Sequence, residues 1–433
     1  MAFLSSKKSQ TFFLKIIIFF TFSFSQELRI SFIKEQDSYF CDRYPFIEKC
    51  SNYLTIEILL GTPPQKIKVN LEFFSNNLWI LDPRCQDLSL SKTSPPFQTD
   101  KSSSLHGVVG GSLQEFKSKH YVQANQVKDT VTISSKKMNN VDFYLAKRFT
   151  DLSINTGVLG LDLNNEKLYC EKGINSFLSQ LKTNGIIENK VFYFDYTGEK
   201  SGELVIGEVP KEKGLKYIEK SVHDNSWSLK TDKIIYGKTI FEKEQILKFK
   251  IELGIILGPN SYYDFILKNA LEHYILTNKC ELKDVLGFPY EHFICKKEKI
   301  NEIIESFPNL EFIVNGKSII FTGKEMFFET KYNEYGLIVY FPKFHFSNEE
   351  EWILGEPFFK KEKLIFNVDN KKIGIFYHIE NLSDIFLYTC RWIIVLFITM
   401  GLIVFILYSK CYRNKRIKRK KKMNQSLLLV PNV

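Results

Sequence analysis

The sequence of 433 residues contains eight cysteines but no C-x-x-C pair, so it offers no support for a cysteine-ligated metal site. Its 22 glycines and 13 prolines are too few for a fibrous or disordered chain. The seven histidines are scattered, without the spacing of a metal site or a catalytic triad, and we expect no cofactor. Phenylalanine, in contrast, occurs 39 times and hydrophobic residues make up 44%, which is enough for a large packed core.

Acidic residues are missing from both ends of the chain. Residues 1–25 carry three lysines and residues 410–433 carry nine basic residues, with no Asp or Glu in either stretch. The net charge of the remainder is therefore 10 − 12 = −2. A nearly neutral body does not favour nucleic acid as a partner.

The N-terminus has the pattern of a secretory signal peptide. Two lysines precede an apolar run from Thr11 to Phe24 that only Lys15 interrupts, and small residues end it at Ser25. We predict a signal peptide over residues 1–25 and a mature chain that starts at Gln26. An uncleaved N-terminal anchor is the alternative, although the run is short for a membrane span.

The C-terminus has the pattern of a membrane anchor. No charged residue occurs from Trp392 to Tyr408, and the run can extend to residues 385–409 if Arg391 reaches the interface. The alternative is a buried core helix, but a water-soluble helix does not need apolar residues on every face. Because the basic tail at 410–433 should stay cytoplasmic, the pattern predicts a type I membrane protein of the secretory pathway or cell surface. In this tail, Cys411 is a candidate palmitoylation site.

The body between the two ends is mainly β in pattern, with short runs rich in Val, Ile, Phe and Tyr between turns. We expect helices near residues 175–181 and 261–274, and a loop at Gly110-Gly111. The expected strands include residues 53–60, 191–196 and 202–206.

Several segments, in order, resemble pepsin-like aspartic proteases. They are YLTIEILLGTPPQ at 53–65, SNNLWI at 75–80, TGVLGL at 156–161, SGELVIG at 201–207, DNSWS at 224–228, WILGEPF at 352–358 and FNVDNKKIG at 366–374. The resemblance implies a mainly β, bilobal fold whose lobes share a sheet and enclose a peptide-binding cleft. From this resemblance and the pattern of the two ends, we expect an N-terminal segment at 26–52, one lobe at 53–215, a second lobe at 216–384, the transmembrane helix at 385–409 and the tail at 410–433.

Catalysis in this family, as the resemblance implies, needs two carboxylates that share one proton, because like charges about 3 Å apart cannot both ionise. Each is carried by an Asp-Thr/Ser-Gly loop, in which glycine permits a tight turn and the hydroxyl locks the loop. Neither Asp-Thr-Gly nor Asp-Ser-Gly occurs anywhere in this chain.

In the first loop, Glu72 stands at the aspartate position, Phe73 at the threonine position and Phe74 at the glycine position. Glu72 keeps a carboxylate but displaces it by about a bond length, and displacements near 1 Å can reduce a rate on the order of a hundredfold. The side chain of Phe74 should not fit the tight turn.

In the second loop, Lys250 stands at the aspartate position, when Gly258-Pro259 is matched to the family's Gly-Pro. An ammonium cannot share a proton with a carboxylate in the required way. Glu252 is the nearest carboxylate. We consider two possibilities for Glu72 and Lys250: an ion pair across the cleft, or two solvated residues in altered loops.

Other expected features of the family are changed or open. The flap tyrosine position falls near Lys117, with Tyr121 as a displaced candidate. The resemblance favours a disulfide between Cys280 and Cys295. The cysteines at 41, 50 and 85 allow one further pair in any combination. Asn381 begins a glycosylation sequon close to the predicted span.

Function depends on the site rather than on the fold. We therefore expect a catalytically inactive homologue, a pseudoprotease that binds a peptide or protein in the lumen or at the cell surface. One alternative is a divergent endopeptidase that uses Glu72 with a partner such as Glu252. Another is a structural or trafficking membrane protein on an inherited protease scaffold.

Overall fold

The computed structural model describes most of the chain, and the statements below refer to that part. Contacts divide the chain into two units, with the boundary between Phe376 and Tyr377. The described residues are 27–36, 52–73, 75–84, 95–115, 121–149, 157–163, 174–221, 226–241, 244–283, 290–330, 333–342, 351–377 and 382–427. The predicted signal peptide lies outside them.

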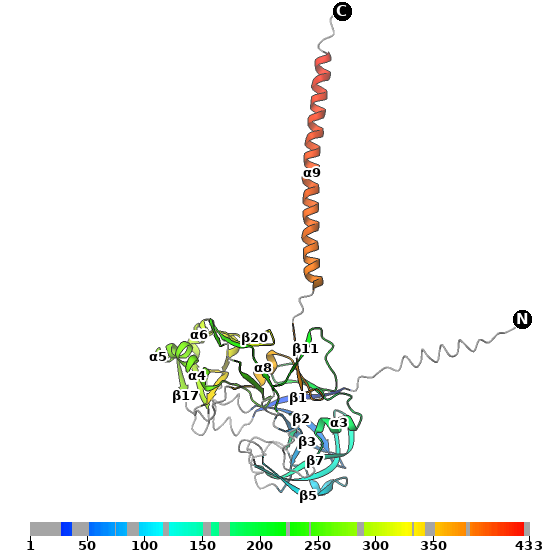
Figure 1. Cartoon of the computed structure of the whole chain (residues 1–433), viewed down its shortest axis with the longest axis vertical. Coiled ribbons are helices and arrows are strands. Elements are labelled where there is room, and N and C mark those ends of the chain that lie inside the picture. The colour runs from blue at the N-terminus through cyan, green and yellow to red at the C-terminus, as the bar shows by residue number, and fades with distance from the viewer. Residues whose placement is uncertain are drawn as a thin grey trace, which may run out of the picture. The chain divides into compact units, whose positions relative to one another are not determined.

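The larger unit is mainly β and has two lobes, which Figure 1 shows as a blue-to-cyan and a green-to-yellow group of strands. Among the described residues, thirteen strands form one sheet in the order β11-β26-β25-β9-β10-β1-β2-β3-β8-β4-β7-β6-β5. Their bounds are β1 Leu28–Gln36, β2 Asn52–Leu60, β3 Gln65–Glu72, β4 Leu78–Leu81, β5 His106–Glu115, β6 Tyr121–Ile133, β7 Lys136–Phe149, β8 Gly157–Gly160, β9 Val191–Tyr196, β10 Ser201–Ile206, β11 Leu215–Glu219, β25 Leu364–Asn367 and β26 Lys372–Phe376. Because β25 pairs with β9, late strands of the chain complete the sheet of its first half.

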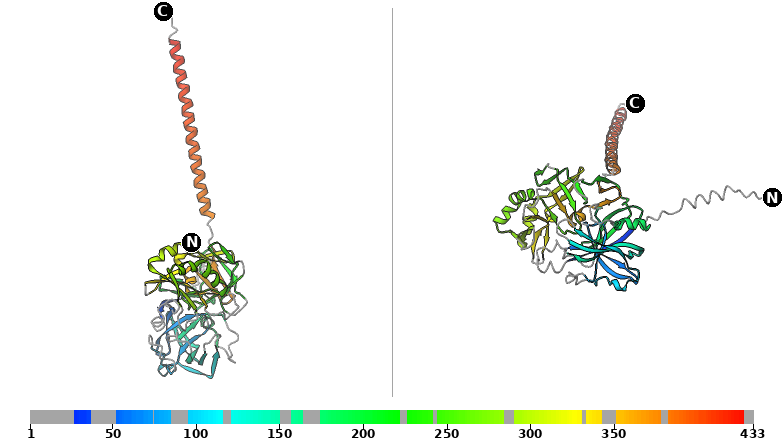
Figure 2. Two further views of the ribbon diagram at one scale, coloured as in Figure 1. Left: turned by 90° about the vertical axis from the view of Figure 1, so that its left-hand side faces the viewer. Right: turned by 60° about the horizontal axis from the view of Figure 1, so that its bottom comes forward.

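The second lobe contains two further sheets, ordered β12-β15-β24-β16-β23-β18-β22-β21, with β17 on β18, and β14-β13-β19-β20. The strands are β12 Ser228–Lys230, β13 Lys233–Tyr236, β14 Thr239–Phe241, β15 Ile246–Phe249, β16 Ile256–Leu257, β17 Cys280–Lys283, β18 Tyr290–Lys296, β19 Leu310–Val314, β20 Lys317–Phe321, β21 Phe327–Glu329, β22 Glu334–Leu337, β23 Val339–Pro342 and β24 Glu351–Leu354. The helices of the described body are a 3-10 turn at Thr99–Lys101, α3 Phe177–Thr183, α4 Asn260–Ile266, a π-helical turn at Leu267–Leu271, α5 Glu272–Leu276, a 3-10 turn at Lys297–Lys299, α6 Ile300–Ser306, α7 Gly323–Met326 and α8 Glu356–Lys361. Figure 2 shows the same two groups of strands from other sides.

Hydrophobic patterning explains these strands. In β19 the alternate residues Leu310, Phe312 and Val314 are buried, as expected for a strand with one face on the core. In β9 the first four residues are all buried, as in a strand covered on both faces. The predicted strands at 53–60, 191–196 and 202–206 and the two predicted helices are confirmed.

The loop expected at Gly110-Gly111 is wrong, because both glycines lie within β5. The pairing of β5 with β6 shifts register between Gly107 and Gly111. Glycine within a strand often marks such an irregularity, since it has no side chain to place in the ladder. The glycine pair therefore belongs to a distorted strand rather than to a connection.

Strand β1 belongs to the centre of the large sheet, although we expected residues 26–52 only as an N-terminal segment. It pairs with β10 on one side and with β2 on the other. Leu28, Ile30 and Phe32 are buried. Phe32 packs edge-on against Phe194 and Tyr196. Residues 28–36 are therefore part of the folded body.

Strand β18 carries the disulfide of the second lobe. The bond joins Cys280 of β17 to Cys295 of β18, as expected, and the two residues are direct cross-strand partners.

Strand β18 also carries a buried histidine. His292 is fully buried, and its Nε2 lies 2.8 Å from the hydroxyl of Tyr340. Burial, with a smaller contribution from Lys283, lowers the pKa of His292 to about 3. The imidazole is therefore neutral in the folded protein at neutral pH.

The smaller unit contains one long helix, α9 Leu382–Leu427. Its stretch Ile393–Lys420 includes 18 consecutive residues with a mean hydropathy of 2.4, which is long and apolar enough to cross a membrane, and it is the one such helix among the described residues. This stretch overlaps the span predicted at 385–409 and fits a membrane anchor. Cys411 is an exposed free thiol on this helix.

Candidate functional site

The two loops that the sequence singled out each connect strands at the centre of a lobe. The first follows Glu72, the last residue of β3, and leads to β4. The second begins at Lys250, directly after β15, and leads to β16. In the first lobe β8 runs parallel to β3 and antiparallel to β4, and in the second β24 runs parallel to β15 and antiparallel to β16. The same local topology therefore holds both loops.

Hydrogen bonds give the two loops the same register. The Gly160 N–H donates to the carbonyl of Asn77 at 2.9 Å, and Asn77 is five residues after Glu72. The Gly355 N–H donates to the carbonyl of Ile255 at 3.1 Å, and Ile255 is five residues after Lys250. By this correspondence Lys250 takes the position in the second lobe that Glu72 takes in the first.

The backbone of each glycine, Gly160 and Gly355, also lies against the neighbouring loop at a similarly short distance. A Cβ atom at Gly160 would lie 2.3 Å from the carbonyl oxygen of Ser75, and one at Gly355 would lie 2.1 Å from that of Leu253. No side chain fits at such distances, so each loop requires glycine on the neighbouring strand. Ser75 and Leu253 each follow the first loop position by three residues, which gives the same register again.

Glu72 is buried, with 4% of its surface exposed. Its carbonyl accepts a hydrogen bond from Leu161 N at 2.9 Å. Further along this loop, the Ser75 hydroxyl accepts hydrogen bonds from Asn77 N at 3.2 Å and from Trp79 Nε1 at 2.8 Å. The serine and tryptophan of the recognised segment thus fix the end of the loop, whereas Phe74 lies outside the described residues.

Phe73, at the expected threonine position, carries no hydroxyl and enters an aromatic cluster instead. It is 2% exposed. Its ring centroid lies 5.1 to 6.1 Å from those of four phenylalanines, three of them edge-to-face and one tilted, which are Phe192, Phe194, Phe359 and Phe366. Two of these come from β9, one from α8 and one from β25. The residue therefore contributes packing between segments far apart in the chain.

Glu252, which belongs to the second loop, makes a side-chain contact with the first loop. Its Oε2 accepts a hydrogen bond from the backbone N–H of Phe73 at 3.1 Å. Because a carboxylate is a strong acceptor for a backbone amide, this contact can hold the loop in the way we expected of a threonine hydroxyl. The sequence identified Glu252 as a nearby carboxylate but not as this link between the loops.

Lys250 is partly exposed, and its backbone fixes the start of the second loop. Its N–H donates to Leu354 O at 3.0 Å, and its carbonyl accepts from Leu253 N at 3.1 Å. Within the described part of the chain, the ion pairs do not include Lys250 with Glu72. The ion pair considered from the sequence is therefore not found, and the contact between the loops is made by Glu252.

A long hairpin occupies the place expected for the flap. Strands β5 and β6 pair up to Glu115 and Tyr121, on either side of the hairpin tip. Lys117 lies outside the described residues, as does the side chain of Tyr121. The hairpin thus forms although the sequence around its tip differs from the family pattern.

The described residues include no group of three or more His, Cys, Asp and Glu side chains able to hold a metal ion. The loops instead place the carboxylate of Glu252 on the backbone N–H that follows Glu72, and Lys250 at the start of the second loop. Such a set can hold a loop or accept hydrogen bonds. It does not present a carboxylate at the first position of both loops, because these positions are Glu72 and Lys250.

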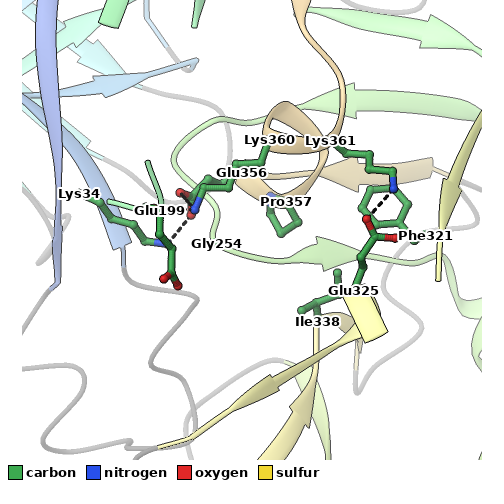
Figure 3. Close-up of a pocket in the computed structure, with 10 residues that line it drawn as sticks. All are labelled: Lys34, Glu199, Gly254, Phe321, Glu325, Ile338, Glu356, Pro357, Lys360 and Lys361. Atoms are coloured by element: carbon green, nitrogen blue, oxygen red, sulfur yellow. Dashed lines mark hydrogen bonds and ion pairs between the residues drawn. The ribbon is translucent and has the colours of Figure 1, made fainter. Parts of the chain in front are cut away.

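A pocket of about 260 Å³ lies beside the second loop and was not expected from the sequence. Gly254 of that loop lines it together with Lys34 from β1 and Glu356 and Lys360 from α8 (Figure 3). The one available signal was the WILGEPF segment, in which Glu356 replaces the aspartate of the family's pattern.

Comparisons with known proteins agree with this architecture. A family model described as eukaryotic aspartyl protease matches residues 52–377. The chain is 24% identical over 360 residues to pregnancy-associated glycoprotein 1 of Sus scrofa, which covers 75% of this chain and 81% of that protein. It is 23% identical over 357 residues to renin of Canis lupus familiaris, with 75% and 80% covered. It is 27% identical over 191 residues to cathepsin D of Gallus gallus, with 38% and 43% covered. With two lobes, a shared sheet and a match over most of its length, the chain belongs to the eukaryotic aspartyl protease family.

Proposed function

We propose that this protein is a membrane-anchored, pepsin-like pseudoprotease that binds a peptide or protein without cleaving it. The observation that carries the proposal is the pair of first loop positions, Glu72 and Lys250, which correspond to one another in hydrogen-bond register. An ammonium at one of them cannot take part in a dyad that shares one proton between two carboxylates.

The neighbouring residues support the same proposal. Phe73 packs in an aromatic cluster and has no hydroxyl to orient a loop. Glu252 already accepts the Phe73 N–H, so its carboxylate serves to hold the loop. A general acid or base has to reach the reacting group directly or through one water. In this proposal Phe73 and Glu252 therefore stabilise the two loops, and neither takes part in catalysis.

Peptide or protein binding is the part of the family's activity that needs no dyad. The two-lobed fold is retained, and the β5–β6 hairpin forms at the place of the flap. A fold can keep its recognition surface while its catalytic residues change, because function lies in the site. We propose that the ligand lies in the cleft between the lobes.

The membrane part of the proposal rests on α9. Its apolar residues fit an anchor, and nine basic residues follow Tyr408 without any acidic residue. Since positive residues stay cytoplasmic, we propose that the body faces the lumen or the cell exterior, after removal of a signal peptide. In sealed microsomes, added protease should remove the tail and leave the body intact, and it should digest the body only after detergent opens the vesicles; protection of the tail would contradict this topology.

The catalytic part is tested with the purified chain in detergent, incubated with denatured globin from pH 3 to 6. We expect no cleavage by the natural protein. Cleavage that disappears in Glu72→Gln would refute the proposal, because it would show that the first loop is catalytic. Cathepsin D under the same conditions serves as the positive control.

A divergent endopeptidase is the second candidate, and one contact favours it. The carboxylate of Glu252 lies 3.1 Å from the backbone nitrogen of Phe73, the residue that directly follows Glu72. This candidate predicts acid-dependent globin cleavage that is lost in both Glu72→Gln and Glu252→Gln. Cleavage that survives both changes would point to a contaminating protease and would exclude this dyad.

A further inference from the structure

The pocket of about 260 Å³ beside the second loop lies between elements of both lobes. On one side are Lys34 of β1 and Glu356 of α8, and on the other are Lys361 of α8 and Glu325 of α7. Figure 3 shows these two pairs on opposite sides of Pro357. We call this cavity the inter-lobe pocket.

Two ammonium groups share one carboxylate on the first side. Lys34 Nζ lies 2.5 Å from Glu356 Oε2, and these side chains are only 13% and 5% exposed. Lys360 Nζ lies 3.1 Å from Glu356 Oε1, in an ion pair that is not aligned as a hydrogen bond. Lys360 also donates to the backbone carbonyl of Glu199 at 2.7 Å. Glu356 therefore balances one of two positive charges.

The electrostatic surroundings of Lys34 agree with two ammonium groups next to one carboxylate. Burial lowers the pKa of Lys34, its interaction with Glu356 opposes that effect, and the charge of Lys360 lowers the pKa further. The carboxylate of Glu199 has a smaller influence than Lys360. Glu199 is exposed, and in Figure 3 its carboxylate points away from the pair.

On the second side the acceptors are already used. Lys361 Nζ lies 2.5 Å from Glu325 Oε1, and Glu325 Oε2 accepts from both the N–H and the hydroxyl of Thr322 at 2.9 Å. An ammonium has three donors, so Lys361 and Lys34 each have donors beyond these contacts. The pocket thus offers more hydrogen-bond donors than acceptors.

Apolar residues complete the lining. Pro357, Ile338 and Phe321 lie among the charged side chains. A ligand that satisfies all these groups has an anionic end and an apolar body. The charged residues of the lining are three lysines and three glutamates, so the excess of one positive charge is local to Glu356, from which the Glu199 carboxylate points away. A monovalent anion matches that local excess, whereas a divalent phosphate exceeds it.

We propose that the inter-lobe pocket binds a small ligand with one carboxylate and an apolar side chain, such as the C-terminal residue of a peptide. Lys34 and Lys360 bind the carboxylate, and the apolar side chain packs against Pro357 and Ile338. Glu72 and Lys250 do not line this pocket. The inference therefore holds whether or not the loops at those residues cleave a substrate.

The test compares N-acetyl-leucine with N-acetyl-leucinamide, which differs by the loss of the charge. Each is titrated by calorimetry into the full chain in neutral detergent, in buffer without phosphate or other carboxylates. We expect N-acetyl-leucine to bind at least about tenfold more tightly than the amide, because a charge-assisted hydrogen bond is lost. We expect Lys360→Gln to weaken the binding of N-acetyl-leucine about tenfold.

The matched control is Lys363→Gln, since Lys363 pairs with Glu212 and Asp195 and does not line the pocket. It should bind N-acetyl-leucine like the natural protein, and thermal unfolding verifies that both variants are folded. Equal binding of the acid and the amide would overturn the proposal, as would no binding at millimolar ligand. So would an equal loss in Lys360→Gln and Lys363→Gln.

Discussion

Replacing Phe73 by alanine tests whether the first loop now serves packing rather than chemistry. The side chain is 2% exposed, and four phenylalanine rings surround it within 6.1 Å between centroids. A buried Phe→Ala change costs about 3–5 kcal/mol, and each aromatic pair adds about 0.5–1.5 kcal/mol beyond the area that it buries. We therefore expect Phe73→Ala to reduce the free energy of unfolding by about 4 kcal/mol or more. That is a large part of the roughly 5–15 kcal/mol typical of folded proteins.

The assay is urea unfolding of the purified chain, followed by tryptophan fluorescence. Trp227 is a suitable reporter, because its ring centroid lies 5.0 Å from that of Phe366 in the same cluster. Phe73→Leu is the matched control, since it conserves most of the volume and should cost about 1 kcal/mol. Phe73→Thr, which returns the family's residue, should cost as much as alanine because it also buries a hydroxyl.

A double-mutant cycle separates the inter-segment contact from the general cost of a cavity. Phe73→Ala and Phe359→Ala should couple by about 1 kcal/mol, because the two rings meet edge to face at 5.7 Å. A cost of Phe73→Ala below about 1 kcal/mol, or no coupling with Phe359, would refute the argument that this position has been reassigned to packing.

Three further predictions concern stability. His292→Gln should make the second lobe more acid-resistant. The pKa of His292 is about 3 in the folded protein and near 6.5 in the unfolded chain, so stability falls as the pH drops below 6.5, by about 2–3 kcal/mol between neutral pH and pH 4.5. Urea unfolding at both pH values measures this, with the exposed His273→Gln as control. Lys34→Met should cost about 3 kcal/mol, since it breaks a buried ion pair, and an unchanged urea midpoint would contradict the pairing. Replacing both Cys280 and Cys295 by serine should cost about 3 kcal/mol, because the bond closes a 15-residue separation, and thermal unfolding with and without reductant shows it.

The family and most strands could be predicted because they depend on local signals. Turn residues, alternating hydrophobic residues and segments such as WILGEPF and SGELVIG each extend over only a few neighbouring positions of the chain. The disulfide between Cys280 and Cys295 could be expected from the family resemblance and is present. The strand through Gly110-Gly111 was not predicted, because a glycine pair signals a turn as readily as an irregular strand.

The roles of the site residues could not be predicted in the same way. Lys34 and Glu356 are 322 residues apart, and the amide of Phe73 and its acceptor Glu252 are 179 apart. No periodicity in a single sequence reports contacts of that range. The sequence predicted where the altered loops lie in the chain, but only the folded arrangement shows the hydrogen bond from the Phe73 amide to Glu252 that links them.

The loops differ from the family pattern at more than the two aspartate positions, so we expect that restoring the two aspartates alone does not restore catalysis. A variant with Glu72→Asp and Lys250→Asp restores both aspartates but keeps the ring of Phe73 in its cluster and the carboxylate of Glu252 on the first loop. It also adds a carboxylate two residues from Glu252, where like charges oppose each other. Since displacements near 1 Å can reduce a rate about a hundredfold, we expect this variant to fold and still leave denatured globin uncleaved from pH 3 to 6. Cleavage by the double variant would show that the two aspartates alone were missing, and that the packing of Phe73 and the contact of Glu252 had left the catalytic geometry intact.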